Sequence, residues 1–454
     1  MVEVPVKIYV TNLVKKARPV ARPLARLSDK VKRAALHGMA DRLLEGATAI
    51  FEANRQDFEA AGKNLEREAA REAVERVRLP SEAVNEMAER LRQIADLPDP
   101  VGETTRMWQQ PDGLQVSRVR IPIGVLAVIS EGEPKVTVES VAICLKSGNV
   151  CVFRGAPEWA RTHTVIFQAL REAADEAGVP EGAVTFVERP EREAALELMR
   201  LHSLLDGIIP RGGLGLRKTV MEQSRVPILC HDGGISHIYI DADADLAMAQ
   251  NIVVNSKVQL ASAPTSADTV LIHQSVARSL LAALVRRLLD EFKVELRGCP
   301  KTLAITSAQH QEMTGHRGVI EAKEEDWGRQ FLSPTLAVKL VKDLDEALDH
   351  IARYGPSNTD TIVTRDYATA MRFVRDVDAS AVMVNASSRL HDGDQLGLGV
   401  QMGISTGRLH AKGPIGLEEL TCQKYVVLGT GQLRQPHPVP LPYEDAIMLK
   451  RPLG

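Results

Sequence analysis

Four short apolar runs alternate with helix-forming stretches in the middle of the chain. They are IGVLAVIS (residues 123–130), NVCVFRG (149–155), VTFVER (184–189) and DGIIPRGG (206–213), and each is followed by apolar positions that recur at helical spacing. Such an alternation indicates βαβ units, in which crossover helices join parallel strands. This part of the chain therefore predicts an α/β fold with a doubly wound parallel sheet.

Helical and strand patterns continue on both sides of these runs. From about Thr11 to Ala95, apolar residues recur at helical spacing and predict several amphipathic helices. Residues 102–120 alternate in character around Pro111-Asp112-Gly113, which predicts a hairpin arm. Further runs predict a second α/β domain that begins near residue 248: ISHIYID (235–241), TVLIH (269–273), TLAVKLV (335–341) and TDTIVT (359–364).

The composition is that of an ordinary globular protein. The chain has 454 residues, of which 44% are hydrophobic, and its 56 Lys and Arg against 59 Asp and Glu leave a net charge of -3. At about 150 residues a domain, this length predicts two or three domains. Basic and acidic residues are interspersed along the chain, so we expect no continuous positive surface that could bind a polyanion. We therefore expect no nucleic acid partner.

Several short sequence features indicate the cellular compartment of the protein and whether it has a membrane segment. No apolar run approaches the roughly 18 residues of a membrane span. Glu3 and Lys7 lie where a signal peptide would be apolar. The five cysteines show no CxxC or Cys/His spacing, which indicates a reducing compartment, and the twelve histidines show no metal-ligand spacing. We therefore expect a cytoplasmic protein with no membrane segment and no metal site.

The sharpest local motif is IPRGGLG (209–215), which follows a predicted strand and opens a predicted helix. Glycines let backbone N–H groups approach a phosphate, the helix N-terminus favours its negative charge, and Arg211 adds a cation. The alternative interpretation is a tight strand-to-helix turn that packs closely. Arg154, at the end of another predicted strand, is a second candidate, and either arginine could contact a 2′-phosphate.

A nucleophile is harder to identify. Cys144 and Cys151 lie in an apolar helix and an apolar strand, which favours a place in the core. Cys230, which precedes His231, is the one thiol beside polar, loop-forming residues. Because adjacent strand residues point to opposite faces, a Cys-His neighbour pair is weak support for catalysis.

The chain also contains five long motifs: CLKSGNVCVFRG (144–155), IIPRGG (208–213), HIYIDADADLAMAQNIVVNSKVQ (237–259), VNASSRLHDGDQLGLG (384–399) and STGRLHAKGPIGLEEL (405–420). Together they resemble the γ-glutamyl phosphate reductases, or glutamate-5-semialdehyde dehydrogenases, a branch of the aldehyde dehydrogenase superfamily. The resemblance covers nearly the whole chain. It implies NADPH-dependent reduction of L-glutamate 5-phosphate to L-glutamate 5-semialdehyde and phosphate, a step of proline biosynthesis.

The resemblance implies an aldehyde-dehydrogenase-like architecture of three parts. Residues 1–101 and 121–247 would form N-terminal helices and a Rossmann-type cofactor-binding domain, and residues 248–403 an α/β catalytic domain. Residues 102–120 and 404–454 would form an oligomerisation arm and tail. We therefore expect a homo-oligomer, a dimer or a tetramer, that binds a small molecule, with an active paralogue as a further candidate partner.

The resemblance also assigns residues to the site. Those that would hold NADP(H) are Ser130, Arg154, Arg211, Gly212, Gly213, Gly215 and Gln330. Those that would contact the substrate are Glu133, Asn385 and Gln401. Because a glutamate of the family is replaced by Gln330, we expect the adenosine half of the nucleotide to be held better than the nicotinamide half.

The position of the family's catalytic cysteine differs in this chain. That cysteine lies in a stretch close to NAKTQRPSVCNALET, which matches residues 255–269 without a gap and aligns the cysteine with Pro264. In the family the thiolate attacks the acyl phosphate and forms a thioester, which a hydride then reduces. Proline has neither a side-chain heteroatom nor a backbone N–H, so no thioester can form at residue 264.

Other positions at the expected reaction centre differ as well. Glu133 stands where the family motif EARPN has its arginine, so an anionic acyl phosphate would meet repulsion. Gln401 replaces the glutamate of GAE, and Asn358 replaces the histidine of an SGHT-like run. Because the scaffold motifs are retained, these changes indicate altered or lost chemistry.

Three interpretations follow. The family reaction could persist with a displaced nucleophile, for which the candidates are Ser262, Thr265, Ser266 and Cys230, although an alcohol needs a base to activate it. The cleft could instead bind a nucleotide and a metabolite without turnover, as a regulatory or scaffolding paralogue. A direct hydride transfer to a free aldehyde would need only an oxyanion stabiliser, which Asn255 and Lys257 could supply.

Overall fold

The four apolar runs form one parallel sheet in the computed structural model, which describes residues 4–62, 74–229, 234–310, 318–355 and 357–434. In the order β5–β4–β3–β6, the strands are Val184–Phe186, Val150–Arg154, Val125–Ser130 and Gly207–Arg211. The strand order reverses between β3 and β6, because β4 and β5 lie on one side of β3 and β6 lies on the other. The carboxyl ends of β3 and β6 therefore border the crevice in which folds of this kind bind ligands.

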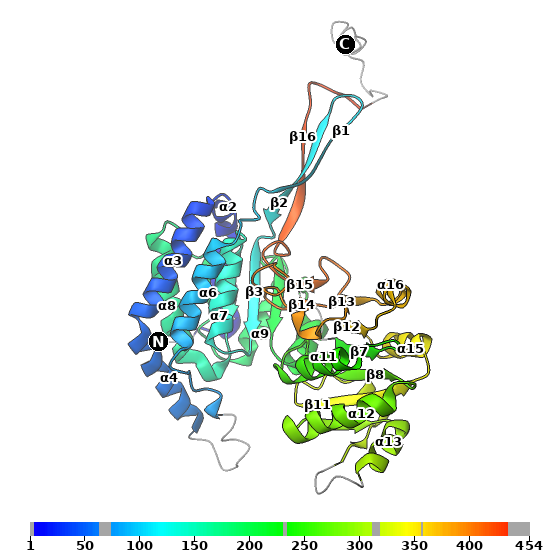
Figure 1. Cartoon of the computed structure of the whole chain (residues 1–454). Coiled ribbons are helices and arrows are strands. Elements are labelled where there is room, and N and C mark those ends of the chain that lie inside the picture. The colour runs from blue at the N-terminus through cyan, green and yellow to red at the C-terminus, as the bar shows by residue number, and fades with distance from the viewer. Residues whose placement is uncertain (1–3, 63–73, 230–233, 311–317, 356, 435–454) are drawn as a thin grey trace.

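Helices pack around this sheet (Figure 1). The predicted N-terminal helices are confirmed and are α1 (Val6–Ala17), η1 (Arg18–Val20), α2 (Ala21–Leu24), α3 (Asp29–Glu45), α4 (Ala47–Gly62) and α6 (Ala83–Asp96). Helix α6 buries Val84, Met87, Leu91 and Ile94, which recur every three or four residues and form one apolar face. The helices that connect the strands are α7 (Pro134–Lys146), η2 (Pro157–Trp159), α8 (Ala160–Glu176), α9 (Arg192–Leu198) and α10 (Leu214–Gln223).

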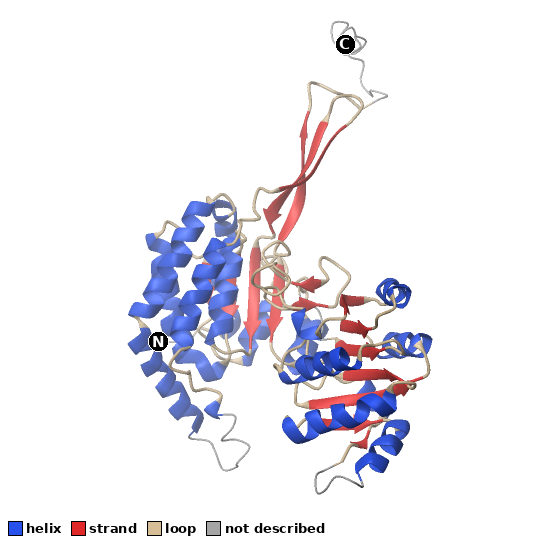
Figure 2. Ribbon diagram, viewed as in Figure 1, coloured by secondary structure: helices blue, strands red, loops and turns tan. Residues whose placement is uncertain are grey.

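Seven parallel strands form a second sheet (Figure 2). In spatial order they are β10 (Ile320–Glu321), β9 (Glu295–Gly298), β11 (Thr335–Val341), β8 (Thr269–His273), β7 (Ile235–Ile240), β12 (Ser357–Val363) and β13 (Ala379–Val384). Around them lie α11 (Leu246–Val258), α12 (Ala277–Val285), η3 (Arg286–Glu291), α13 (Pro300–His310), α14 (Glu324–Trp327), α15 (Leu344–Tyr354), α16 (Tyr367–Asp376) and η4 (Ser388–Leu390). The sequence predicted neither β9 nor β10 nor β13.

The predicted boundary near residue 248 falls after a strand of this second sheet. Strand β7 is hydrogen-bonded between β8 and β12, so the second sheet begins at Ile235. An apolar run indicates that a buried strand will form, but its pairing partners, which the run does not encode, decide which sheet it joins.

The predicted hairpin forms an arm that projects from the body (Figure 1). Strands β1 (Thr104–Gln109) and β2 (Gln115–Pro122) pair antiparallel across the predicted turn. A strand that was not predicted, β16 (Thr421–Leu428), pairs with β2 over its full length. Before reaching the arm, the chain forms the short pair β14 (Ile404–Ser405) and β15 (Gly413–Pro414).

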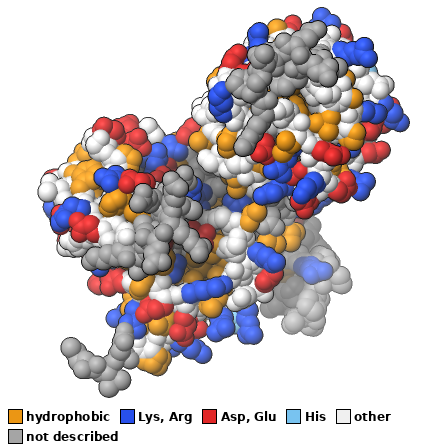
Figure 3. Space-filling model, turned by 90° about the horizontal axis from the view of Figure 1, so that it is seen from below, with side chains coloured by type: hydrophobic (Ala, Val, Ile, Leu, Met, Phe, Trp, Pro, Cys, Tyr) orange, Lys and Arg blue, Asp and Glu red, His pale blue; other side chains and the backbone are white. Residues whose placement is uncertain are grey.

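The surface carries no single charged field on the face seen in Figure 3, where Lys and Arg side chains are interspersed with Asp and Glu side chains. Among the helices within the described ranges, none combines the length and the apolar character needed to cross a membrane.

Two fully buried lysines connect the N-terminal helices to the first sheet. Lys32 Nζ on α3 donates to Asp99 Oδ2 at 2.7 Å and to the Lys146 carbonyl at 3.2 Å. Lys146 Nζ, at the end of α7, donates to Asp29 Oδ1 at 2.5 Å and to the Ala95 carbonyl at 2.9 Å. A buried cation is tolerated only where such partners replace its water, so the two lysines fix three helices relative to one another.

We predict that Lys32→Met lowers the apparent melting temperature by roughly 5 °C or more, because it leaves Asp99 without its cation in a nearly buried position. Differential scanning calorimetry gives the comparison. Arg33→Met, which removes an exposed pair with Asp96 from the same helix, serves as the control and should change the melting temperature little. Equal decreases in melting temperature for the two variants would show that the buried ion pair stabilises the protein no more than the exposed pair does.

Candidate functional site

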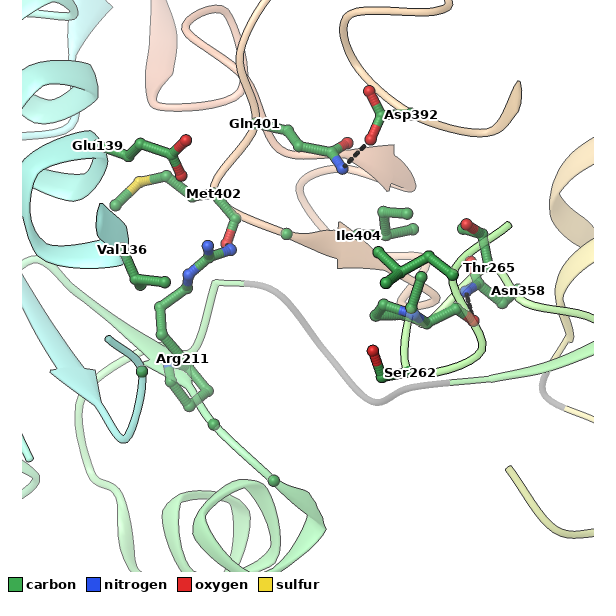
Figure 4. Close-up of a pocket in the computed structure, with 18 of the residues that line it drawn as sticks. Val136, Glu139, Arg211, Ser262, Thr265, Asn358, Asp392, Gln401, Met402 and Ile404 are labelled. Atoms are coloured by element: carbon green, nitrogen blue, oxygen red, sulfur yellow. Dashed lines mark hydrogen bonds between the residues drawn. The ribbon is translucent and has the colours of Figure 1, made fainter. Parts of the chain in front are cut away.

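The carboxyl ends of β3 and β6 open into a cavity of about 650 Å³, here called the central cavity. Glu131 and Gly132 follow β3 on one wall, and residues 210–213 form the end of β6 and the turn into α10. Residues 260–265 of the second domain form the opposite wall, and residues 401–404 close a third side (Figure 4). A ligand in the central cavity would therefore touch both domains.

The structure brings a large part of the predicted site together. The predicted residues that line the central cavity are Arg211, Gly212, Gly213, Ser262, Pro264, Thr265, Asn358 and Gln401. Arg154 and Gly215 line a neighbouring cavity of about 460 Å³, here called the lateral cavity. Glu131 lines both cavities.

Other predicted residues lie outside both cavities. The Asn385 amide accepts from the Thr364 N–H at 3.0 Å and donates to the Thr364 carbonyl at 2.9 Å, so both of its ends are engaged. Glu133 is exposed at the start of α7, and Asn255 is exposed on α11. Ser130 is fully buried and its hydroxyl accepts from the Gly132 N–H at 2.9 Å, which shapes the turn after β3.

The turn from β6 into α10 is open on its outer side. Gly213 is the N-cap of α10, and a Cβ placed on Gly215 would meet no heavy atom within 4 Å. Glu131 Oε2 accepts from the Gly213 N–H at 3.0 Å. A Cβ on Gly212 would lie only 2.5 Å from Glu131 Oε2, so glycine at residue 212 lets the carboxylate approach the turn.

The lateral cavity presents two cations. Arg154 is 7% exposed, its Nη2 donates to the Pro190 carbonyl at 2.7 Å, and its buried Nε has no partner among the described residues. Burial lowers the pKa of Arg154, and the nearby carboxylates of Glu158 and Glu131 oppose that effect. Arg192, the first residue of α9, lines the same cavity. The pair provides a positive site for an anionic group.

At residue 264 the backbone is held by two amide side chains. Asn358 Nδ2 donates to the Pro264 carbonyl at 2.8 Å, and Gln330 Nε2 donates to the same oxygen at 3.2 Å. Gln330 Nε2 also donates to the Gly234 carbonyl at 3.1 Å. A carboxylate at 330 could not donate to these carbonyls. Three positions that the resemblance marks as departures from the family, residues 264, 330 and 358, therefore form one hydrogen-bonded cluster.

None of the described residues acts as an activating base for the hydroxyl groups near Pro264. Ser262 is exposed in the central cavity, whereas the Thr265 hydroxyl is bonded to Arg389 Nη1. Ser266 is 2% exposed and does not line the cavity. His391 lines the cavity, and burial lowers its pKa to about 4, but its Nδ1 is bonded to Thr359 Oγ1 and no described serine or threonine contacts its Nε2.

No described thiol lines the central cavity. Cys144 and Cys151 are buried in α7 and β4, as predicted from their apolar surroundings. Cys299 is buried beside Thr302, and Cys422 lies at the start of β16 in the arm. Cys230 lies outside the described residues.

Lys257 is fully buried and lies behind the loop that carries Pro264. Its Nζ donates to the Ala267 carbonyl at 2.9 Å, and burial lowers its pKa to about 8. Burial also raises the pKa of the neighbouring Asp268 carboxyl to about 6, although Lys257 and two backbone N–H groups oppose this shift. Because Lys257 does not line the central cavity, the structure gives it a role in supporting the loop.

Several cavity residues were not predicted. Arg217 on α10 lines the central cavity and has no partner within the described ranges, and Arg389 and Asp392 line it from the second domain. Gln401 points toward Asp392, with Nε2 3.5 Å from Asp392 Oδ2 (Figure 4). These side chains come from segments far apart in the sequence, so spacing alone could not group them. Nowhere in the described part of the chain do three metal-ligating side chains meet.

Comparison with known proteins gives the lineage. The chain matches the Aldehyde dehydrogenase family over residues 10–328. The gamma-glutamyl phosphate reductase of Thermodesulfovibrio yellowstonii is 43% identical over 430 residues, which are 95% of this chain and 100% of that protein. The protein of the same name from Magnetococcus marinus is 45% identical over 92% of this chain and 97% of that protein.

Solved structures agree with these relatives. Gamma-glutamyl phosphate reductase from Thermotoga maritima superposes with a TM-score of 0.88 at 38% identity, over 94% of this chain and 100% of that chain. An acetylating aldehyde dehydrogenase from Geobacillus thermoglucosidasius, at 19% identity and a TM-score of 0.65, shares the fold. The predicted resemblance is therefore confirmed, and the chain belongs to the aldehyde dehydrogenase family and, within it, to the gamma-glutamyl phosphate reductase group.

Proposed function

We propose that this chain binds NADP(H) and a small acidic metabolite in the crevice between its two domains, and that it does not perform the thioester step of a gamma-glutamyl phosphate reductase. One observation carries the proposal: Pro264 occupies the position of the family cysteine and lines the central cavity without offering a nucleophile. The protein is then a binding member of an enzyme family, with a regulatory or scaffolding role. Fold and descent are common to the group, whereas chemistry depends on the atoms at the site.

The lateral cavity fits the adenosine half of NADP(H). Arg154 has an unpartnered buried Nε, and Arg192 adds a second cation, so a 2′-phosphate would find charge-assisted donors there. The open turn at Gly213 and Gly215 lies between the lateral and central cavities and offers backbone N–H groups to the diphosphate. When bound, NADP(H) would supply a hydride donor or acceptor to the central cavity.

The side chains that line the central cavity are better suited to binding an acidic ligand than to reducing it. The guanidinium of Arg217 has no partner among the described side chains and faces the cavity, where a carboxylate or phosphate would be attracted to it. On the opposite wall, Asn358 and Gln330 hold the Pro264 carbonyl, so the loop is fixed by groups that cannot act as a nucleophile or base. This arrangement is suited to binding, while none of the described residues that line the central cavity provides an activated nucleophile for the covalent step.

Turnover tests the loss of chemistry. We predict that the wild-type protein forms NADPH from glutamate 5-semialdehyde, NADP⁺ and phosphate at the background rate in a spectrophotometric assay. Pro264→Cys restores the thiol, and the triple variant Pro264→Cys, Gln330→Glu, Asn358→His also restores the family's carboxylate and imidazole. We expect measurable turnover from the triple variant and less from the single one, because the thiol needs the surrounding groups.

Clear wild-type turnover would contradict the proposal and would indicate a displaced nucleophile or a direct hydride transfer. Cys230→Ser and Ser262→Ala then separate these routes, since loss of activity in either variant identifies the nucleophile. Turnover that survives both substitutions, and also Thr265→Val and Ser266→Ala, would favour direct hydride transfer to the free aldehyde.

Nucleotide binding is tested by calorimetry. We predict that wild-type protein binds NADPH and adenosine 2′,5′-bisphosphate, and that Arg154→Ala weakens NADPH roughly 10- to 100-fold through loss of charge-assisted hydrogen bonds. Binding of NADH, which lacks the 2′-phosphate, should change little. Arg200→Ala, an exposed arginine just beyond α9, is the control. Failure of the wild-type protein to bind the bisphosphate would contradict the proposal.

The arm supports a homo-oligomer. Within the described ranges, β1 and β16 form the two edges of its sheet, and Met107, Tyr425, Val427 and Leu428 are each more than half exposed. Apolar side chains on a projecting sheet with open edges are typical of a surface that pairs with another chain. A second copy of this chain is the partner that the arm fits.

We predict that the wild-type protein is a dimer or tetramer in multi-angle light scattering, and that the double variant Val427→Lys, Leu428→Lys shifts it toward the monomer by placing charges on the buried surface. Gln423→Lys, a change of an exposed polar residue on the same strand, should leave the mass unchanged. A monomeric wild-type protein would exclude assembly through the arm.

A further inference from the structure

A carboxylate lies at the junction of the two cavities. Glu131 is the first residue after β3, and its side chain lines both the central and the lateral cavity. Any molecule that extends from the cations of the lateral cavity into the central cavity must pass it. In a dinucleotide, the part that spans this junction is the diphosphate, which carries negative charge.

The contacts of Glu131 hold its carboxylate on the turn. Glu131 Oε2 accepts from the Gly213 N–H at 3.0 Å, at the N-terminus of the ten-residue helix α10. The backbone is anchored as well, because the Glu131 N–H donates to the Arg211 carbonyl at 2.8 Å. On its other side the carboxylate interacts electrostatically with the buried Arg154, so it lies between that cation and the positive N-terminus of α10.

The glycine at residue 212 belongs to the same arrangement. A Cβ at this position would lie 2.5 Å from Glu131 Oε2 and 2.8 Å from Leu216 Cδ2. The absent side chain therefore leaves the space in which the carboxylate reaches the turn. One backbone N–H group that would receive a phosphate, that of Gly213, is thus occupied by a group of the chain itself.

We propose that Glu131 is an internal competitor for the dinucleotide: its carboxylate fills the anion position on the α10 turn, and NADP(H) binds only when the diphosphate displaces it. The inference rests on the proposed nucleotide-binding function and adds how that site is regulated. Two anions cannot share one N–H group and one helix terminus without strong repulsion. Glu131 therefore lowers the affinity for ligands that carry the diphosphate more than the affinity for ligands that occupy only the lateral cavity, which its side chain also lines.

The test compares two ligands on three proteins by isothermal titration calorimetry. NADPH spans the junction, whereas adenosine 2′-monophosphate carries the adenosine and 2′-phosphate but no diphosphate. The variant is Glu131→Gln, which keeps the size of the side chain and removes its charge. The matched control is Glu133→Gln, which removes the same charge two residues along, from a side chain that lines neither cavity.

We expect Glu131→Gln to bind NADPH about 5- to 30-fold more tightly than wild type and to strengthen the binding of adenosine 2′-monophosphate by a clearly smaller factor. Glu133→Gln should match wild type for both ligands, and its agreement excludes a general effect of net charge. Retained binding of the monophosphate also shows that the variant is folded around the lateral cavity.

Unchanged or weaker NADPH binding by Glu131→Gln, with the monophosphate bound normally, would overturn the inference and leave the proposed function standing. Tighter NADPH binding by Glu133→Gln to the same degree would also overturn it, because the effect would then come from long-range charge. If neither ligand bound to any of the three proteins, the proposed function would fail and the inference with it.

Discussion

The pairing of β3 with β6 determines where the groups of the crevice lie. In the register of the two strands, Ser130 faces Arg211, and the Glu131 N–H continues the ladder to the Arg211 carbonyl. The two strands therefore end side by side, and the turn that follows β3 lies against the N-terminus of α10. This contact brings the Glu131 carboxylate to the N-terminus of α10, which is the anion-binding turn of the proposed function. Each cavity takes one wall from this junction.

The two halves of the crevice have diverged to different degrees. On the nucleotide side, Arg154, Gly213 and Gly215 remain as the family pattern implies, and the structure places them around one junction. On the reaction side, Pro264, Gln330 and Asn358 all differ from that pattern and meet at one carbonyl oxygen. Two amides that hold one carbonyl form a defined local structure. We therefore interpret the reaction side as rebuilt for loop rigidity in a chain that binds ligands.

The sequence predicted the elements that are uniform in character and missed those that depend on context. Strand β3 is apolar throughout and buried on both faces, so its eight-residue motif identified it. Strand β16 mixes exposed polar and apolar residues because it lies in the arm, and its period-2 pattern is weak. Strand β13 is only half buried at the edge of the second sheet, and it was missed for the same reason.

The same contrast holds for the candidate site. The glycine-rich turn at Gly212 was found from sequence because close backbone approach requires glycine there. Glu131 and Arg192 were missed, since their relevance arises from contacts between a β3 turn, α9 and α10 that no spacing records. Glu133 and Asn385 were expected to contact the substrate from the resemblance, but their side chains lie outside both cavities.

Intact-mass spectrometry tests the central claim, that the crevice binds a nucleotide but supports no acyl-enzyme. Wild-type protein is incubated with glutamate 5-semialdehyde and NADP⁺ without phosphate, so that any thioester or ester formed has no phosphate to release it, and NADP⁺ binding is measured in the same sample by calorimetry. We predict bound NADP⁺ and a protein of unchanged mass. An added glutamyl group, mapped by peptide analysis to any side chain of the crevice, would contradict the claim and would identify the nucleophile that replaces the family cysteine.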